Sequence, residues 1–173
     1  MSEKVLYLSV PRGTISAGDI MSIRRDDDEF LVIDEVAATP GFTVIFAFEG
    51  IRVIGQYSNQ IQFTLKGYYD GVLNHDVKVY IWNFNTETWD GMTSNSKDLP
   101  DATAEDTYTF TIDIGDYVDV DRFQAFTGYD RSVQIMIQHD DAGNAAHKLH
   151  IDQVLLDFIT TGTDRHRELL AHA

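Results

Sequence analysis

One short stretch of the chain carries several side chains that could bind another molecule. It covers residues 74–89 and reads NHDVKVYIWNFNTETW. Lys78, Tyr80 and Trp82 occur at every second position, and Phe84 continues the series. Aromatic rings bind by stacking, and an ammonium group donates hydrogen bonds. This stretch is therefore the first candidate for a binding surface.

The spacing of the residues between these side chains predicts the element that positions them. Val77, Val79 and Ile81 alternate with the aromatic residues, which is the period of a β-strand with two different faces. The aliphatic face fits a packed core. The strand is predicted to end at residues 83–86, where Asn and Thr side chains favour a turn. Trp89 follows on the far side of that turn.

The aromatic side of this strand has two interpretations. It could be part of a concave sheet surface on which sugar rings stack, with amide side chains supplying hydrogen bonds. Alternatively, residues 1–40 or another subunit cover it. We favour the second interpretation, because residues 1–40 need a docking site. The candidate binding residues are Tyr68, Tyr80, Trp82, Phe84, Gln134 and Gln138.

From residue 42 onward, apolar side chains recur at every second position in segments separated by turn signals. This pattern predicts an all-β fold, an antiparallel jelly-roll β-sandwich over residues 41–160, and not a βαβ fold. Residues 91–106 are polar and are predicted to form a long loop. The predicted core includes Val77, Val79, Ile81, Phe110, Ile112, Ile135 and Ile137.

The two ends of the chain are predicted to lie outside this sandwich. Residues 1–40 contain two short apolar strands, which cannot be stable alone and must dock on the sandwich or on a neighbouring molecule. This lead-in is the candidate assembly segment. It should be buried through Phe30 and Val32 or through Leu31 and Ile33. Residues 161–173 are predicted to contain one short helix, which is marginal on its own.

Sequence motifs for catalysis or metal binding are missing. No nucleophile elbow or glycine-rich phosphate loop occurs, so we expect no catalytic residues and no enzyme activity. The acidic run at residues 26–29 is interpreted as a solvated loop, because it lacks the ligand spacing of a calcium site. Two of four histidines could meet an aspartate around a metal, but no HxH or HExxH spacing is present, and we expect no metal or cofactor. These residues are His75, His139, His147 and His150 with Asp140 or Asp152.

The composition restricts the partners of the chain. Its 13 basic and 28 acidic residues give a formal charge of −15, which argues against binding to a phosphate backbone. No segment approaches the roughly 20 consecutive apolar residues that cross a bilayer. The first residues do not form a good signal peptide, so we expect a soluble protein made in the cytoplasm. Without cysteine, the 173 residues contain no disulfide.

Several motifs resemble a jelly-roll domain that recurs in virion proteins of tailed bacteriophages. They are GYYDG at residues 67–71, HDVKV at 75–79, and WNFNT at 82–86 with Trp89. The closing HKLHIDQV at residues 147–154 resembles the last strand of that domain. The similarity covers about residues 42–158. It implies a galactose-binding-like sandwich, similar in shape to carbohydrate-binding modules, and it supplies no catalytic residues.

The resemblance also implies a function and a location. We expect a non-enzymatic structural component of a virion, made in the host cytoplasm: a capsid-decoration or minor capsid protein, or a head–tail accessory protein. Its partners would be major capsid or tail proteins, bound through residues 1–40. By analogy it would form a homo-oligomer, with a trimer as one option. The alternative is a carbohydrate-binding module, or a tail or fibre adhesin, that recognises host surface glycans.

Overall fold

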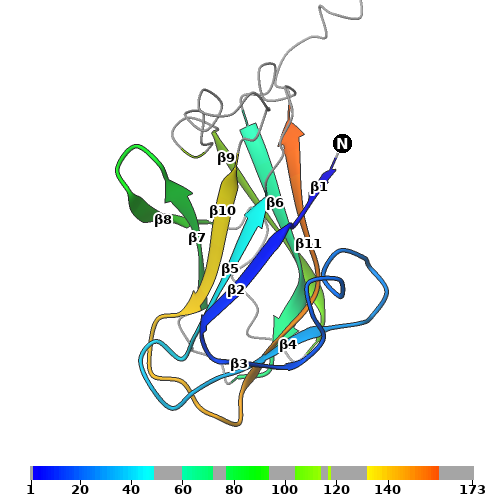
Figure 1. The fold of residues 1–173 in the computed structure, drawn as a ribbon, viewed down its shortest axis with the longest axis vertical. Coiled ribbons are helices and arrows are strands. Elements are labelled where there is room, and N and C mark those ends of the chain that lie inside the picture. Colours follow the sequence, from blue (N-terminus) through cyan, green and yellow to red (C-terminus); the bar gives the residue numbers. More distant parts are fainter. Residues whose placement is uncertain are drawn as a thin grey trace, which may run out of the picture.

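The computed structural model describes residues 2–48, 60–71, 77–93, 104–113, 117 and 132–159, and its regular elements are all strands (Figure 1). Every strand pairing is antiparallel, so the all-β prediction is confirmed. The strands are β1 (Ser2–Lys4), β2 (Tyr7–Arg12), β3 (Thr14–Ala17), β4 (Leu31–Asp34), β5 (Phe42–Phe48), β6 (Gln60–Tyr69), β7 (Val77–Asn83), β8 (Thr88–Met92), β9 (Asp106–Asp113), β10 (Val133–His139) and β11 (Lys148–Ile159).

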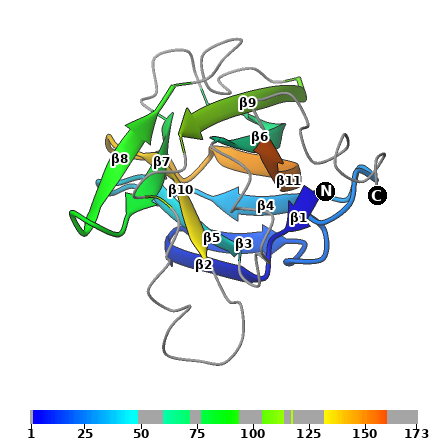
Figure 2. The same cartoon turned by 90° about the horizontal axis from the view of Figure 1, so that it is seen from above.

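The strands form two sheets that pack as a sandwich. The six-stranded sheet has the order β3-β4-β11-β6-β9, and β1 also pairs with β11. The five-stranded sheet has the order β2-β5-β10-β7-β8. The view from above places β9, β6 and β11 in one layer and β7, β10 and β2 in the other (Figure 2). Strands that are neighbours in a sheet are therefore often far apart in the sequence.

The core lies between the sheets and follows the period of two along each strand. Phe63, for example, lies at ring distances of 6.3 Å from Phe48 and 6.0 Å from Phe110, so that three strands meet through aromatic contacts. Ile112 is only partly buried at the margin of the core. The other predicted core residues are all buried: Val77, Val79, Ile81, Phe110, Ile135 and Ile137.

The N-terminal segment up to residue 40 contributes strands to both sheets. β2 pairs with β5 at the edge of the five-stranded sheet. In the other sheet, β4, an isolated bridge from Arg24 to Gln153, and β1 follow one another along the same edge of β11. Residues 1–40 were predicted to dock on the sandwich or on a neighbouring molecule, and the structure shows the first of these alternatives. The boundary predicted at residue 40 does not separate two parts of the fold, because β11 needs partners along this edge.

The four candidate assembly residues, one just before β4 and three within it, alternate between the core and the outer side of the sheet. Leu31 and Ile33 have no exposed surface and belong to the core, so they are not available to another subunit. Phe30 and Val32 are half-buried. The Phe30 ring contacts Tyr68 edge-on, with ring centroids 5.7 Å apart. The burial of Leu31 and Ile33 is therefore achieved within the chain.

The turns and ends differ in part from the sequence prediction. Asn83 accepts backbone hydrogen bonds from Asn85 and Thr86 at 3.0 and 3.1 Å, which confirms the predicted turn. Part of the predicted 91–106 loop is strand, because β8 extends to Met92 and β9 begins at Asp106. The helix predicted within residues 161–173 lies outside the described residues. Among the residues that are described, no helix is long and apolar enough to span a bilayer.

Replacing Leu31 tests whether the N-terminal segment is part of the core. Leu31→Ala removes a fully buried side chain and should lower the free energy of unfolding by about 2–5 kcal/mol. Leu6→Ala is the matched control, since Leu6 is 48% exposed, and should change it by less than about 0.5 kcal/mol. Urea denaturation followed by circular dichroism measures both. Equal, small effects would contradict the integration of residues 1–40.

Candidate functional site

The outer side of the five-stranded sheet carries three aromatic residues and two glutamines, which we call the aromatic face. It consists of Tyr80 and Trp82 on β7, Trp89 on β8, and Gln134 and Gln138 on β10. On β7 and β10 the neighbouring residues point into the core, so these side chains point outward. β7 and β10 are adjacent strands of the sheet. The sheet pairing thus brings together four of the six predicted binding residues.

The two tryptophans form a pair across the β7–β8 hairpin. Trp82 and Trp89 are directly opposite in the strand register, and their rings lie 5.2 Å apart with an interplanar angle of 66°. The turn between them includes Glu87 in the left-handed region, with φ of 54°. Trp89 was not among the predicted binding residues. Its position just beyond a predicted hairpin turn is the signal that could have identified it.

The residue opposite Tyr80 on the edge strand has no side chain. Its partner on β8 is Gly91, and a Cβ atom added to Gly91 would meet nothing within 4 Å. On the other side Tyr80 pairs with Met136, which is nearly buried at 7% exposure. The sheet therefore has room for an added carbon atom at Gly91, beside Tyr80.

Hydrogen bonds to Asp140 fix the side chains at one end of the aromatic face. The Tyr80 hydroxyl donates to Oδ2 of Asp140 at 2.5 Å, and Nε2 of Gln138 donates to Oδ1 at 2.8 Å. The Thr43 hydroxyl donates to Oε1 of Gln138 at 2.8 Å. Lys78 lies 3.5 Å from Oδ2 of Asp140. Because hydrogen bonds to a carboxylate are stronger than neutral ones, Tyr80 is held in a defined orientation.

A fourth aromatic residue lies at the opposite edge of the same sheet. Tyr7 on β2 is 66% exposed. It pairs with Ala47, which pairs with Gln134, so the three share one row on the outer face. Four strand spacings separate β2 from β8, which is about 19 Å. The sequence prediction missed Tyr7, because residues 1–40 were treated as a separate segment.

Two predicted members of the site lie elsewhere. Phe84 belongs to the hairpin turn and not to the strand. Tyr68 is on the outer side of the other sheet, where its ring stacks on His150 at 4.2 Å with an interplanar angle of 6°. The lead-in does not cover the aromatic face with any of its described strands, since β2 extends the sheet sideways from β5. Tyr68 and Tyr80 appear close in sequence but face opposite directions across the sandwich.

Of the described histidines, His139 and His147 lie beside the same carboxylate, Glu35, with Nδ1 of His147 3.8 Å from Oε2, whereas His150 lies beside Asp70. His139 is buried, and its Nδ1 lies 2.6 Å from Oε1 of Glu35. The Tyr69 hydroxyl donates to the same oxygen at 2.7 Å, and burial together with this carboxylate raises the pKa of Tyr69. His150 instead lies 3.2 Å from Asp70. His75 is outside the described residues.

A group of acidic residues that the sequence did not reveal surrounds Lys66. Asp28, Glu105 and Asp152 have oxygen atoms within 4.8 Å of one another, which is a spacing that can hold a hard cation. However, Nζ of Lys66 lies 2.7 Å from Asp152 and 3.0 Å from Glu105, and it also contacts Asp26. Lys66 lowers the pKa of Asp26 by a hydrogen bond, and the surrounding carboxylates raise the pKa of Lys66. The ammonium group thus supplies the positive charge that the acidic group requires.

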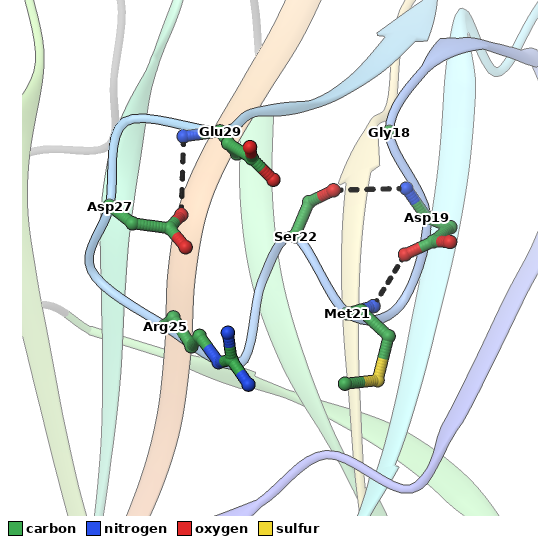
Figure 3. A pocket seen from close by; sticks show the side chains of 7 residues that line it. All are labelled: Gly18, Asp19, Met21, Ser22, Arg25, Asp27 and Glu29. Carbon is green, nitrogen blue, oxygen red and sulfur yellow. Dashed lines mark hydrogen bonds between the residues drawn. The ribbon is translucent and has the colours of Figure 1, made fainter.

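The loop between β3 and β4 contains a pocket of about 460 Å³ (Figure 3). Two carboxylates that line the pocket accept hydrogen bonds from the backbone of the same loop. Asp19 accepts from the Met21 N–H at 2.7 Å, and Asp27 accepts from the Glu29 N–H at 3.3 Å. It has no aromatic surface, so the aromatic face remains the better candidate site. The lining residues are Gly18, Asp19, Met21, Ser22, Arg25, Asp27 and Glu29.

No protein-family model and no curated protein sequence matches this chain. Similar solved structures include carbohydrate-binding β-sandwiches. A structure described as "CBM4 structure and function" is 18% identical, covers 77% of this chain and 73% of its own, and has a TM-score of 0.47. The N-terminal cellulose-binding domain of β-1,4-glucanase C from Cellulomonas fimi is 17% identical, with coverage of 86% and 95% and a TM-score of 0.46.

A tailspike protein of bacteriophage CBA120 is also similar. The identity to its tailspike protein 4 is 11%, with 88% of this chain and 19% of that chain covered, and the TM-score is 0.43. At such identities and scores, none of these likenesses carries an argument about function. Function is therefore inferred from the side chains of the aromatic face.

The pKa of Asp90 predicts an acid-dependent contribution to stability. Asp90 accepts hydrogen bonds from Asn83 at 3.0 Å and Tyr117 at 2.8 Å, which lower its pKa below 3.8. A lowered pKa in the folded state stabilises the fold above the unfolded pKa, and this contribution is lost as the pH falls. Asp90→Asn should therefore destabilise the protein at about pH 6 and less at about pH 2.5. Urea denaturation at both values measures this, and a pH-independent difference would contradict it.

Proposed function

We propose that the aromatic face binds a glycan chain and that the protein acts as a carbohydrate-binding module without a reaction of its own. The observation that carries this proposal is the combination of Tyr80, Trp82 and Trp89 with two amide side chains on one outer sheet face. Sugar rings have apolar C–H faces and polar edges. A strip of aromatic rings beside glutamine side chains matches both features.

Each group on this face has a separate role in the proposed binding. Trp82 and Tyr80 provide stacking surfaces, and Gly91 leaves room beside Tyr80. Gln134 and Gln138 supply hydrogen bonds to the edges of the sugar. Asp140 holds Tyr80 before the ligand arrives, which lowers the entropy lost on binding.

The row of side chains across the sheet also indicates how the glycan chain would run. Tyr7 lies on β2, Gln134 on β10 and Trp82 on β7, so a glycan chain that crosses the strands would meet all three side chains. The distance of about 19 Å between the outermost strands spans several sugar rings. We therefore propose an internal segment of an extended oligosaccharide as the ligand.

The location on a virion is a further proposal that rests on the sequence motifs alone. A glycan-binding sandwich on a tail or fibre would recognise host surface glycans, while a capsid-decoration role would need no ligand. Phe30 and Val32 remain candidates for contacts with other virion proteins, and a symmetric oligomer is compatible with either role. Mass spectrometry of purified particles should detect a fixed number of copies. Complete absence from the particles would exclude a virion component.

Replacing Trp82 tests the glycan proposal. A glycan array should identify a ligand, and calorimetry should give its affinity. Trp82→Ala should weaken that affinity by at least about tenfold, because aromatic anchors contribute a large share of binding energy. Gly91→Val should have a similar effect by filling the space beside Tyr80, while its β-branched side chain fits a strand.

The matched control is Tyr68→Ala, since Tyr68 is a half-buried aromatic residue on the outer side of the other sheet. Its replacement should leave the affinity unchanged. The proposal is wrong if no glycan binds, or if Tyr68→Ala weakens binding as much as Trp82→Ala. Thermal unfolding of all three variants separates loss of binding from loss of fold.

A further inference from the structure

Tyr7 stands apart from the other aromatic residues on the outer side of the five-stranded sheet. It lies on β2 at one end of the strand order, whereas Trp89 lies on β8 at the other end (Figure 2). Trp82 on β7 contacts Trp89, so these two rings form one cluster at the β8 end. Three strand spacings, or about 14 Å, separate β2 from β7. Tyr7 is therefore a second, distant contact surface.

The side chain of Tyr7 lies on the same side of the sheet as this cluster. Leu8, the next residue, packs against the core, so Tyr7 points outward. Tyr7 pairs with Ala47, which pairs with Gln134 on β10, the strand beside β7. The residue between Tyr7 and Gln134 in this row thus has only a methyl group as its side chain. A glycan chain that follows the row would meet Tyr7 after Gln134.

The Tyr7 side chain is held less firmly than that of Tyr80. It is 66% exposed, more than any other large hydrophobic side chain of the described residues. The Tyr80 hydroxyl donates to Asp140, whereas in the described part of the chain the Tyr7 side chain has no hydrogen bond and no ring contact. Ordering a free side chain costs conformational entropy, so a contact with Tyr7 alone would be weak. The contact adds affinity when the glycan is already bound at Trp82, because it is then intramolecular.

We propose that Tyr7 is the distal contact of the glycan site and selects ligands by chain length. This inference rests on the proposed glycan binding and specifies its ligand class: linear oligosaccharides that span the sheet from Trp82 to Tyr7. A short oligosaccharide at the β8 end contacts Trp82 and Tyr80 but does not reach Tyr7. A longer one contacts all three. The width of the sheet, about 19 Å, sets the length beyond which further sugar units gain no contact with its strands.

The contributions of Trp82 and Tyr7 should differ in their dependence on ligand length. Trp82 should contribute to the affinity for every oligosaccharide that binds. Tyr7 should add about three- to tenfold once the chain reaches it, which is the scale of one aromatic contact. Because Tyr7 is mostly exposed, its replacement should leave the midpoint of urea denaturation unchanged.

The experiment measures affinity by calorimetry over a graded series of linear oligosaccharides, from the disaccharide upward. Cello-oligosaccharides and xylo-oligosaccharides are the first probes, followed by a series prepared from each polysaccharide that the glycan array identifies. With the unmodified chain, affinity should rise with length and then level off. Tyr7→Ala should weaken binding of the longest members by about three- to tenfold and leave the affinity for the shortest binding members unchanged.

Three further variants assign the effect to the Tyr7 ring. Tyr7→Phe keeps the ring and should retain the gain in affinity with length. Leu6→Ala alters the neighbouring residue, which is 48% exposed, and should bind every length as the unmodified chain does. Trp82→Ala should weaken the binding of short and long oligosaccharides alike.

The outcomes separate this inference from the proposal on which it rests. An equal effect of Tyr7→Ala on short and long oligosaccharides, or no effect at any length, would overturn the inference and leave Trp82-dependent glycan binding in place. Loss of the length-dependent gain in Tyr7→Phe or in Leu6→Ala would also overturn it, since the Tyr7 ring would then not be its source. Absence of binding to every glycan would refute the proposed function itself.

Discussion

The strand β11 imposes the constraint on which the arrangement of the whole chain depends. Its 12 residues form hydrogen bonds with β6 along one edge, and β4, the bridge at Arg24 and β1 share the other edge. Unpaired backbone groups within a sheet are costly, so the N-terminal segment has to follow this edge. Because side chains alternate along every strand, the pairing also determines which residues face the core. A slip of one position would exchange the buried and outer residues of a strand.

Two buried carboxylates tie the N-terminal segment to the rest of the molecule. Glu35 accepts hydrogen bonds from Tyr69 and from the backbone of Asn144, and it lies against His139. Asp152 accepts a backbone hydrogen bond from Asp28 and pairs with Lys66. A buried charge is stable only when it is paired and hydrogen-bonded. The acidic composition is therefore compatible with the fold because its buried members have partners from distant parts of the sequence.

The parts that the sequence predicted were those governed by local periodicity. The alternation in Val77, Val79 and Ile81 predicted the strand, its core face and the outward direction of Tyr80 and Trp82. Periodicity contains no information about which strands become neighbours, so Tyr68 was assigned to the wrong sheet face. The hydrogen bonds around Asp140 and Lys66 depend on the same long-range pairing and were not predictable. Tyr7 was overlooked for a related reason, because only the pairing of the short strand β2 with β5 shows which sheet face Tyr7 is on.

Nuclear magnetic resonance tests most directly whether the aromatic face binds the glycan. Titrating the labelled protein with a glycan selected on the array shows which signals shift. If the aromatic face binds the glycan, the indole N–H signals of Trp82 and Trp89 and the β10 amide signals at Gln134 and Gln138 should shift, with little change at Tyr68 and His150. Shifts confined to Tyr68, His150 and their neighbours on the six-stranded sheet would contradict it.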